Sequence, residues 1–255
     1  MTGSGAPWNA ASSSYSLPRD EVHVWRAGLD WPPESTGKLY GFLSPDERRR
    51  ADAFHFQADR MRHIVGRAIS RVLIGRCLGA DPAAVRFALG LSGKPRLAEE
   101  FDAGLNFNIS HSGDYVLVAL AYGRELGVDV EQIRTDIGTA DIAARFFSAN
   151  ECSCLARLPA SERHDAFFAC WTRKEAYIKA RGDGLSLALN EFDVAFLPGD
   201  EPRLLETRHC PAEALRWTVR NLDVGANHKA ALVAEGPAAR LRCWEWLGDL
   251  PSAAG

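Results

Sequence analysis

One order of elements occurs twice along this chain, and that repetition constrains the fold more than any other feature. Residues 22–125 and residues 126–246 each run from a strand through a capped helix and a long helix to a further strand and a hairpin. The capped helices begin after Ser44 and Ser148. A glutamate follows each serine by three residues, which is the pattern of a capping box. We interpret the repetition as a diverged internal duplication, whose two lobes would pack face to face with a natural ligand site in the cleft between them.

Helices and strands mixed in this order predict an α+β fold, with each lobe a small antiparallel sheet packed on a long helix. The long helices are expected over residues 59–78 and 163–181. The strand at 115–121 is expected to form a hairpin with the strand that precedes it, at 107–109, and another with the strand that follows it, at 127–131. The matching hairpin of the second lobe is expected to pair 229–234 with 241–246.

The same pattern sets the segment boundaries. We expect an N-terminal extension at 1–21, a first lobe at 22–125, a second lobe at 126–246 and a tail at 247–255. The second lobe is expected to carry a metal site, for the reasons given below.

Charge and composition argue against several classes of protein. The chain has 30 basic and 33 acidic residues, whereas a protein that coats nucleic acid is strongly basic. It contains no run of 18 apolar residues, so no membrane span is expected. Residues 1–20 lack the basic start and apolar run of a secretory signal. The six cysteines include no C-x-x-C pair, so we expect reduced thiols in a cytoplasmic protein.

A carboxylate lies on the apolar face of the second long helix. At 100° per residue, Glu175 lies about 40° from Trp171, within a stripe that Phe167 and Ile178 also define. A carboxylate there needs a cation, a metal ion or several hydrogen-bond donors. The alternative is a solvent-exposed pair between Glu175 and Lys179, one turn along the helix. The stripe favours a functional carboxylate, because exposed pairs lie opposite the core.

Two more carboxylates lie close together on a strand. Alternation places Asp129 and Glu131 on one face of the strand and the flanking valines on the other. Paired acids of this kind also occur by chance on solvated strands, so the pair alone is weak evidence. With Glu175 as a third oxygen ligand, the set suits Mg²⁺ with positions left for water and phosphate.

Three segments could bind an anion. The loop at 108–113 offers hydroxyls, the His111 imidazole and backbone N–H groups, and Lys94 lies in a Gly-Lys-Pro turn. The first long helix is rich in arginine, whose planar fork suits phosphate oxygens. The common nucleotide-binding loops and the nucleophile elbow are absent from the sequence.

Taken together, these segments resemble the 4'-phosphopantetheinyl transferases of the surfactin-synthetase-activating type. Residues 127–131 match the motif GxDxE, and residues 171–179 match WxxKEAxxK. The segments Phe-Asn-Ile-Ser-His-Ser-Gly at 107–113 and Gly-Lys-Pro at 93–95 lie upstream in the expected order. The resemblance covers roughly residues 40–197.

The resemblance implies a fold and an activity. Enzymes of this family are pseudo-twofold α+β monomers with the site between the lobes. They move 4'-phosphopantetheine from coenzyme A to a serine of an apo acyl or peptidyl carrier protein, and 3',5'-ADP is released. The expected metal is Mg²⁺, with Mn²⁺ as a substitute. No nucleic acid or membrane partner is implied.

The resemblance also implies residue roles. Asp129, Glu131 and Glu175 would hold the metal ion, and Glu175 would act as base for the serine, directly or through water. Lys179 would neutralise charge on the transferring phosphate and on the leaving group. The residues implied in coenzyme A binding are Arg62, Lys94, Ser110, His111, Lys174 and Lys179.

Two departures from the family pattern leave points open. Arg48, Arg49 and Arg50 follow Glu47, so the arginine that would contact the 3'-phosphate is not fixed. Gln132 stands where a basic residue is common. Two other functions compete: a Mg²⁺-dependent phosphohydrolase that uses the same carboxylates, and a non-enzymatic module that binds coenzyme A or interacts through its arginine-rich helix.

Overall fold

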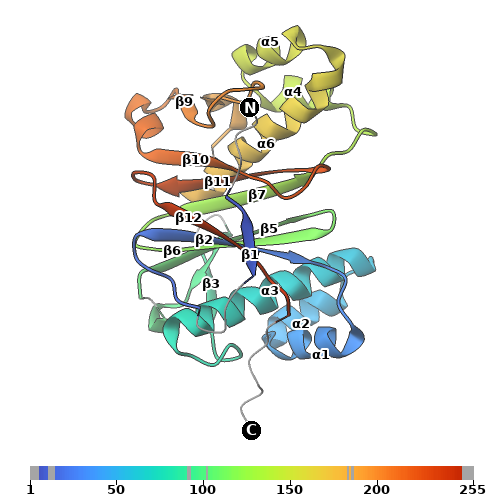
Figure 1. Cartoon of the computed structure of the whole chain (residues 1–255), viewed down its shortest axis with the longest axis vertical. Coiled ribbons are helices and arrows are strands. Elements are labelled where there is room, and N and C mark those ends of the chain that lie inside the picture. The colour runs from blue at the N-terminus through green and yellow to red at the C-terminus, as the bar shows by residue number, and fades with distance from the viewer. Residues whose placement is uncertain are drawn as a thin grey trace.

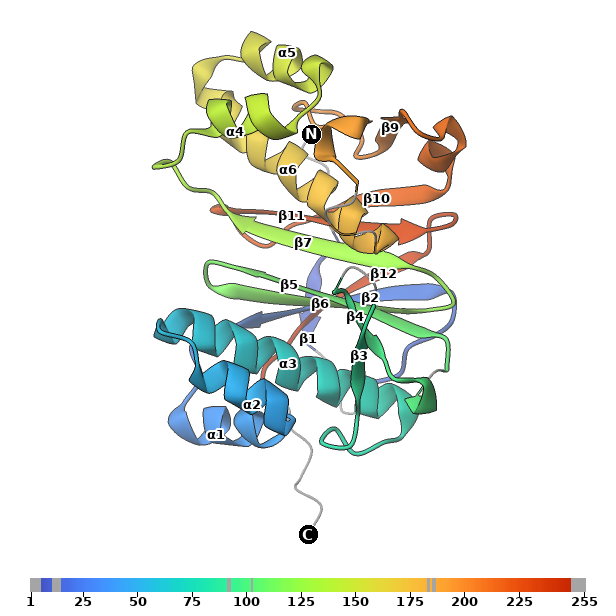
Figure 2. The same ribbon diagram turned by 180° about the vertical axis from the view of Figure 1, so that it is seen from behind.

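The computed structural model describes residues 6–10, 15–90, 93–101, 103–182, 184 and 187–248. Two β-sheets, each built around three antiparallel strands, stack on each other in the middle of the molecule, and one long helix covers the outer face of each (Figures 1 and 2). This confirms the two-lobed α+β fold. The tail expected at 247–255 lies outside the described residues except for its first two positions.

Apart from a 3-10 helix at Glu99–Phe101, the described part of the first lobe contains eight helices and strands. They are β2 (Glu21–Gly28), α1 (Pro33–Gly41), α2 (Pro45–Asp52), α3 (Gln57–Leu78), β3 (Phe87–Leu89), β4 (Pro95–Leu97), β5 (Leu105–Ser112) and β6 (Tyr115–Tyr122). In the sheet, β6 lies between β2 and β5 and is antiparallel to both. The small hairpin of β3 and β4 is separate from this sheet.

The second lobe repeats the order. Its elements are β7 (Leu126–Gln132), α4 (Thr139–Phe146), α5 (Ala149–Arg157), α6 (Ala160–Arg181), β8 (Phe192–Val194), β9 (Leu204–Thr207), β10 (Trp217–Leu222) and β11 (His228–Glu235). Here β11 lies between β7 and β10, as β6 lies between β2 and β5. Because both element order and strand order recur, the structure supports an internal duplication.

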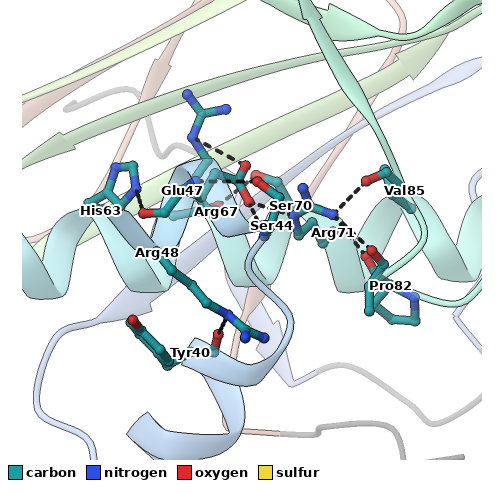
Figure 3. Close-up of polar contacts among 12 residues, drawn as sticks. Tyr40, Ser44, Glu47, Arg48, His63, Arg67, Ser70, Arg71, Pro82 and Val85 are labelled. Carbon is teal, nitrogen blue, oxygen red and sulfur yellow. Dashed lines mark hydrogen bonds and ion pairs between the residues drawn. The ribbon is translucent and has the colours of Figure 1, made fainter. Parts of the chain in front are cut away.

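An ion pair recurs at matching positions of the two lobes. Glu47 closes the capping box of α2 and contacts Arg71 at 2.8 Å (Figure 3). Glu151 closes that of α5 and contacts Lys174 at 2.8 Å. Arg71 and Lys174 are each the fifteenth residue of a 22-residue helix. Each also donates to backbone carbonyls in the connection that follows its helix. The duplication therefore extends to the side chains that attach each short helix to its long one.

The last strand departs from the prediction. β12 (Arg240–Glu245) does not pair with β11 but runs parallel to β2 in the first sheet, and β1 (Trp8–Ala10) adds to its other side. The expected hairpin of 229–234 with 241–246 is therefore wrong, because β7 and β10 already occupy both edges of β11. The matching hairpin of the second lobe is β10 with β11. Residues 240–245 belong to the first sheet although the sequence placed them in the second lobe.

The boundary between the lobes also differs from a hairpin. β6 pairs with β5, as predicted, but β7 pairs with β11 and belongs to the other sheet. The facing sides of the two sheets pack through small and branched apolar residues, among them Val22, Val24, Leu117, Val128 and Val130. Because Val128 and Val130 fill this interface, alternation turns the acids of β7 toward α6.

No helix within the described part of the chain combines the length and the apolar character needed to cross a bilayer.

Candidate active site

A pocket of about 330 Å³ lies where β5, β7 and α6 meet. It is lined by Ile109, Ser110, His111, Asp129, Glu131, Trp171, Glu175 and Lys179. The structure thus gathers the three predicted metal ligands and the predicted catalytic lysine in one place, from strand β7 and helix α6. A larger pocket of about 570 Å³ lies beside α1 and contains none of the predicted site residues.

The carboxylates of the pocket lie in a poorly solvated environment. Burial, and then the charge of Asp129, raise the pKa of Glu131 to about 7. The same two causes, in the same order, raise the pKa of the half-buried Glu175. Asp129 is buried, and its Oδ2 has no hydrogen-bond partner. Acids held so close together favour a cation among them.

Lys179 supplies a positive charge at the pocket. Its Nζ lies 2.6 Å from Asp129 Oδ1 and donates to Ser110 Oγ at 3.0 Å. It is therefore directed into the pocket, which disfavours the alternative of a solvent-exposed pair between Glu175 and Lys179.

The donor set of the pocket fits a hard divalent cation. Mg²⁺ takes oxygen ligands and retains several waters, and this pocket offers three carboxylates and an unpartnered buried oxygen on Asp129. Among the residues that the structure describes, no three acid, histidine or cysteine side chains are already drawn together to hold a metal ion. Ligation would therefore bring Asp129, Glu131 and Glu175 closer together.

Arg62 lies near enough to His111 for its charge to act on that ring, but the two residues make different contacts. His111 lines the pocket, and desolvation, then the charges of Lys179 and Arg62, lower its pKa. The neutral ring would gain a proton beside a bound phosphate. Arg62 donates through Nε and Nη2 to the carbonyl oxygen of Gly113 and through Nη1 to Asp59. It therefore braces the turn that follows His111 and is not one of the pocket-lining residues.

Lys174 does not contact the pocket. Its side chain is fully buried, and its Nζ is bound by Glu151 and the carbonyl oxygens of Leu189 and Phe192. The expectation that Lys174 reaches a phosphate is therefore wrong, because the ammonium has no path to solvent. The helical angle that places Glu175 on the inner stripe also turns Lys174 into the core.

Lys94 also lies away from the pocket-lining residues. Its Nζ is 3.0 Å from Glu125 Oε2 and donates to the carbonyl oxygens of Leu126 and Ala180. It therefore links the turn between the lobes to the C-terminal end of α6. These contacts favour a structural role over the predicted coenzyme contact.

The Lys94→Met variant separates the two roles. We expect it to lower the free energy of unfolding by about 1–3 kcal/mol, the scale of hydrogen bonds to a charged group, with little change in KM for coenzyme A. Denaturant titration and steady-state kinetics measure the two effects. A raised KM with unchanged stability would restore the coenzyme-binding role.

The arginines after Glu47 are partly assigned by their contacts. Arg48 donates to the carbonyl oxygens of Tyr40 and Gly41, and its bond to Tyr40 is visible in Figure 3. Arg49 pairs with Asp46 in the same helix. Arg50 lies near enough to His63 for its charge to contribute to lowering the pKa of that ring.

Sequence reasoning missed two residues at the site. Trp171 lines the pocket, although the periodicity of α6 had placed it with the core. Ser112 donates its hydroxyl to Glu131 Oε2 at 2.8 Å. Its spacing of two residues from Ser110 on a strand was the available signal.

Comparison with known proteins identifies the family. Residues 125–233 match the 4'-phosphopantetheinyl transferase superfamily, and residues 30–122 match the N-terminal part of 4'-phosphopantetheinyl transferases. The 4'-phosphopantetheinyl transferase HetI of Nostoc sp. is 38% identical over 240 residues, which cover 94% of this chain and 98% of the relative. The chain belongs to the 4'-phosphopantetheinyl transferase family.

A second relative supports the type within the family. The 4'-phosphopantetheinyl transferase Sfp of Bacillus subtilis is 32% identical to this transferase over 205 residues, which cover 80% of this chain and 87% of the relative. The two regions that match the family models, residues 30–122 and 125–233, lie within the two lobes. Residues 125–233 contain the three carboxylates of the pocket.

Proposed function

We propose that this transferase moves the 4'-phosphopantetheine group of coenzyme A to a serine hydroxyl of an acyl or peptidyl carrier protein. The reaction would depend on Mg²⁺ and release 3',5'-ADP. One observation carries the proposal: Asp129, Glu131, Glu175 and Lys179 line a single pocket at the junction of the lobes. We further place the enzyme in the cytoplasm as a monomer that activates carrier proteins of secondary metabolism.

The pocket supplies what phosphoryl transfer needs, which is mainly positioning and neutralisation of charge. The serine oxygen forms a bond to the phosphorus that carries pantetheine, and the bond from that phosphorus to the 3',5'-ADP oxygen breaks. Glu175 receives the serine proton, directly or through one water. Lys179 neutralises charge on the phosphate and on the leaving group. Mg²⁺, held by Asp129, Glu131 and Glu175, would act as a Lewis acid on the pyrophosphate oxygens.

The remaining predicted residues take limited roles in this proposal. His111 would meet a phosphate at the mouth of the pocket, and its pKa should rise when an anion binds. Ser110 lines the pocket, but Lys179 and Asp129 already engage its hydroxyl. Arg62 would act indirectly, by holding the turn at Gly113 in place.

The direct test is incubation with coenzyme A, Mg²⁺ and a panel of apo carrier domains, followed by mass spectrometry of the carriers. We expect a carrier to gain one phosphopantetheine group while 3',5'-ADP accumulates. Hydrolysis of coenzyme A with every carrier unmodified would instead support the phosphohydrolase. Binding of coenzyme A without turnover would support the non-enzymatic module.

Loss of a metal ligand should reduce transfer without unfolding the protein. We expect Asp129→Ala and Glu131→Ala each to lower kcat/KM at least about tenfold, because charge neutralisation on the pyrophosphate is lost. The fold should persist, since removing one of two repelling acids relieves that repulsion. Near-normal rates for either variant at low Mg²⁺, measured in the same mass assay, would show that the metal assignment is wrong.

A further inference from the structure

A row of polar side chains on β5 covers the free edge of β7. β7 is the outer strand of its sheet, so the N–H groups on its far side need partners from outside the sheet. Three alternate residues of β5 accept them through their side chains. The bonds run from Val128 N to Asn108 Oδ1 at 2.9 Å, from Val130 N to Ser110 Oγ at 3.3 Å, and from Gln132 N to Ser112 Oγ at 3.0 Å.

Two members of this row also contact the acids of the pocket. Ser110 Oγ donates to Asp129 Oδ1 at 2.9 Å, and Ser112 Oγ donates to Glu131 Oε2 at 2.8 Å. A hydroxyl has one proton and two lone pairs. In each serine one lone pair of the hydroxyl oxygen accepts a backbone N–H group of β7, and the hydroxyl proton is donated to the neighbouring carboxylate. Because the backbone of β7 holds each serine hydroxyl in place, the hydroxyl fixes the orientation of one carboxylate relative to that strand.

We propose that Ser112 and Ser110 are positioning residues that orient Glu131 and Asp129 as ligands of the metal ion. The inference rests on the proposed metal site. Neither serine need touch the metal or the coenzyme for this role. Partners behind a metal ligand typically change metal affinity by about 10–100-fold when they are removed.

Asn108 separates orientation of the acids from attachment of the lobes. Like the serines, it accepts an N–H group of β7, and it is buried. Its bond is to the backbone of Val128, whose side chain fills the interface between the sheets. A variant at Asn108 therefore weakens the attachment of β5 to β7 without removing a donor from either carboxylate.

The experiment compares Mn²⁺ binding by full-length variants saturated with coenzyme A. Electron paramagnetic resonance measures free Mn²⁺, and coenzyme A without protein gives the baseline. We expect Ser112→Ala to weaken Mn²⁺ binding about tenfold or more, and Ser112→Thr, which keeps the hydroxyl, to remain near the parent. Asn108→Ala should melt at a lower temperature yet bind Mn²⁺ like the parent. Coenzyme A affinity in chelator should be the same in all of them.

Several results would overturn the inference. One is parental Mn²⁺ affinity in Ser112→Ala. Another is an equal loss in Asn108→Ala, which would mean that attachment of the lobes alone matters. If Ser112→Ala does not fold, Ser112→Cys keeps the volume with a weaker donor and should still bind Mn²⁺ more weakly. A parent that binds no more Mn²⁺ than the coenzyme A baseline would overturn the proposed metal site, and this inference with it. Parental binding in Ser112→Ala overturns only the inference.

Discussion

The Glu175→Gln variant should bind coenzyme A but transfer phosphopantetheine at least about a hundredfold more slowly, the scale of losing a general base. Glutamine is nearly isosteric, so the shape of the pocket is kept while the proton acceptor is removed. The loss should fall on kcat, because the serine proton is transferred only as the reaction proceeds. Single-turnover transfer and binding of coenzyme A by calorimetry measure the two quantities.

The same variant should be no less stable than the parent when a chelator is present. Burial and the charge of Asp129 raise the pKa of Glu175 in the folded protein. A raised carboxyl pKa means that the charged form is penalised on folding, so the penalty is present at neutral pH and disappears as the pH falls below the ordinary value. Any gain from Glu175→Gln should therefore be seen near pH 7 and be lost near pH 4. Thermal melts at both pH values test this. A clearly destabilised but fully active variant would show that Glu175 is a structural partner and that the site is misplaced.

The acids of the site could be predicted because their signals are local. Strand alternation alone places Asp129 and Glu131 on one face, and helical spacing alone places Glu175 on the inner stripe. What brings Glu175 to Asp129 is the packing of α6 on β7, for which the sequence offered only the joint motif match. For the row of β5 side chains, the spacing of two residues places Ser110 and Ser112 on one face of a strand, but it does not show that this face meets β7, because the row joins the edges of two different sheets.

The errors over Lys174 and over β12 have different physical causes. A motif records that a lysine is required, not where its ammonium points. At 100° per residue, Lys174 lies about −60° from Trp171, close to Phe167 at about −40°, so its burial was available from the helical angle. β12, by contrast, pairs in parallel with β2 across almost the whole chain. Its apolar alternation is the same for either sheet, so no local pattern could assign it.

Lys174→Met should destabilise the protein by about 3–5 kcal/mol, the cost of breaking a buried ion pair from one side. The ammonium binds Glu151 Oε2 at 2.8 Å and the carbonyl oxygen of Leu189 at 2.7 Å, and it lies 4.2 Å from the centre of the Phe192 ring. Methionine fills much of the same volume but leaves the Glu151 charge without its cation in a site that is 1% exposed. Two backbone N–H groups still bind Glu151, so the capping box should survive while α6 is held less firmly. Urea unfolding followed by fluorescence measures the loss.

A matched control lies on the surface. Lys38 pairs with Glu34 at 2.7 Å on α1 with both side chains largely exposed, so Lys38→Met should leave the unfolding midpoint unchanged. The double variant Glu151→Gln/Lys174→Met removes both charges and should recover part of the stability that Lys174→Met loses, because an unpaired buried charge costs more than a neutral pair. If Lys174→Met were as stable as the parent and instead raised KM for coenzyme A, the lysine would reach the substrate after all. In that case the enzyme would work in a conformation in which Lys174 is not paired with Glu151.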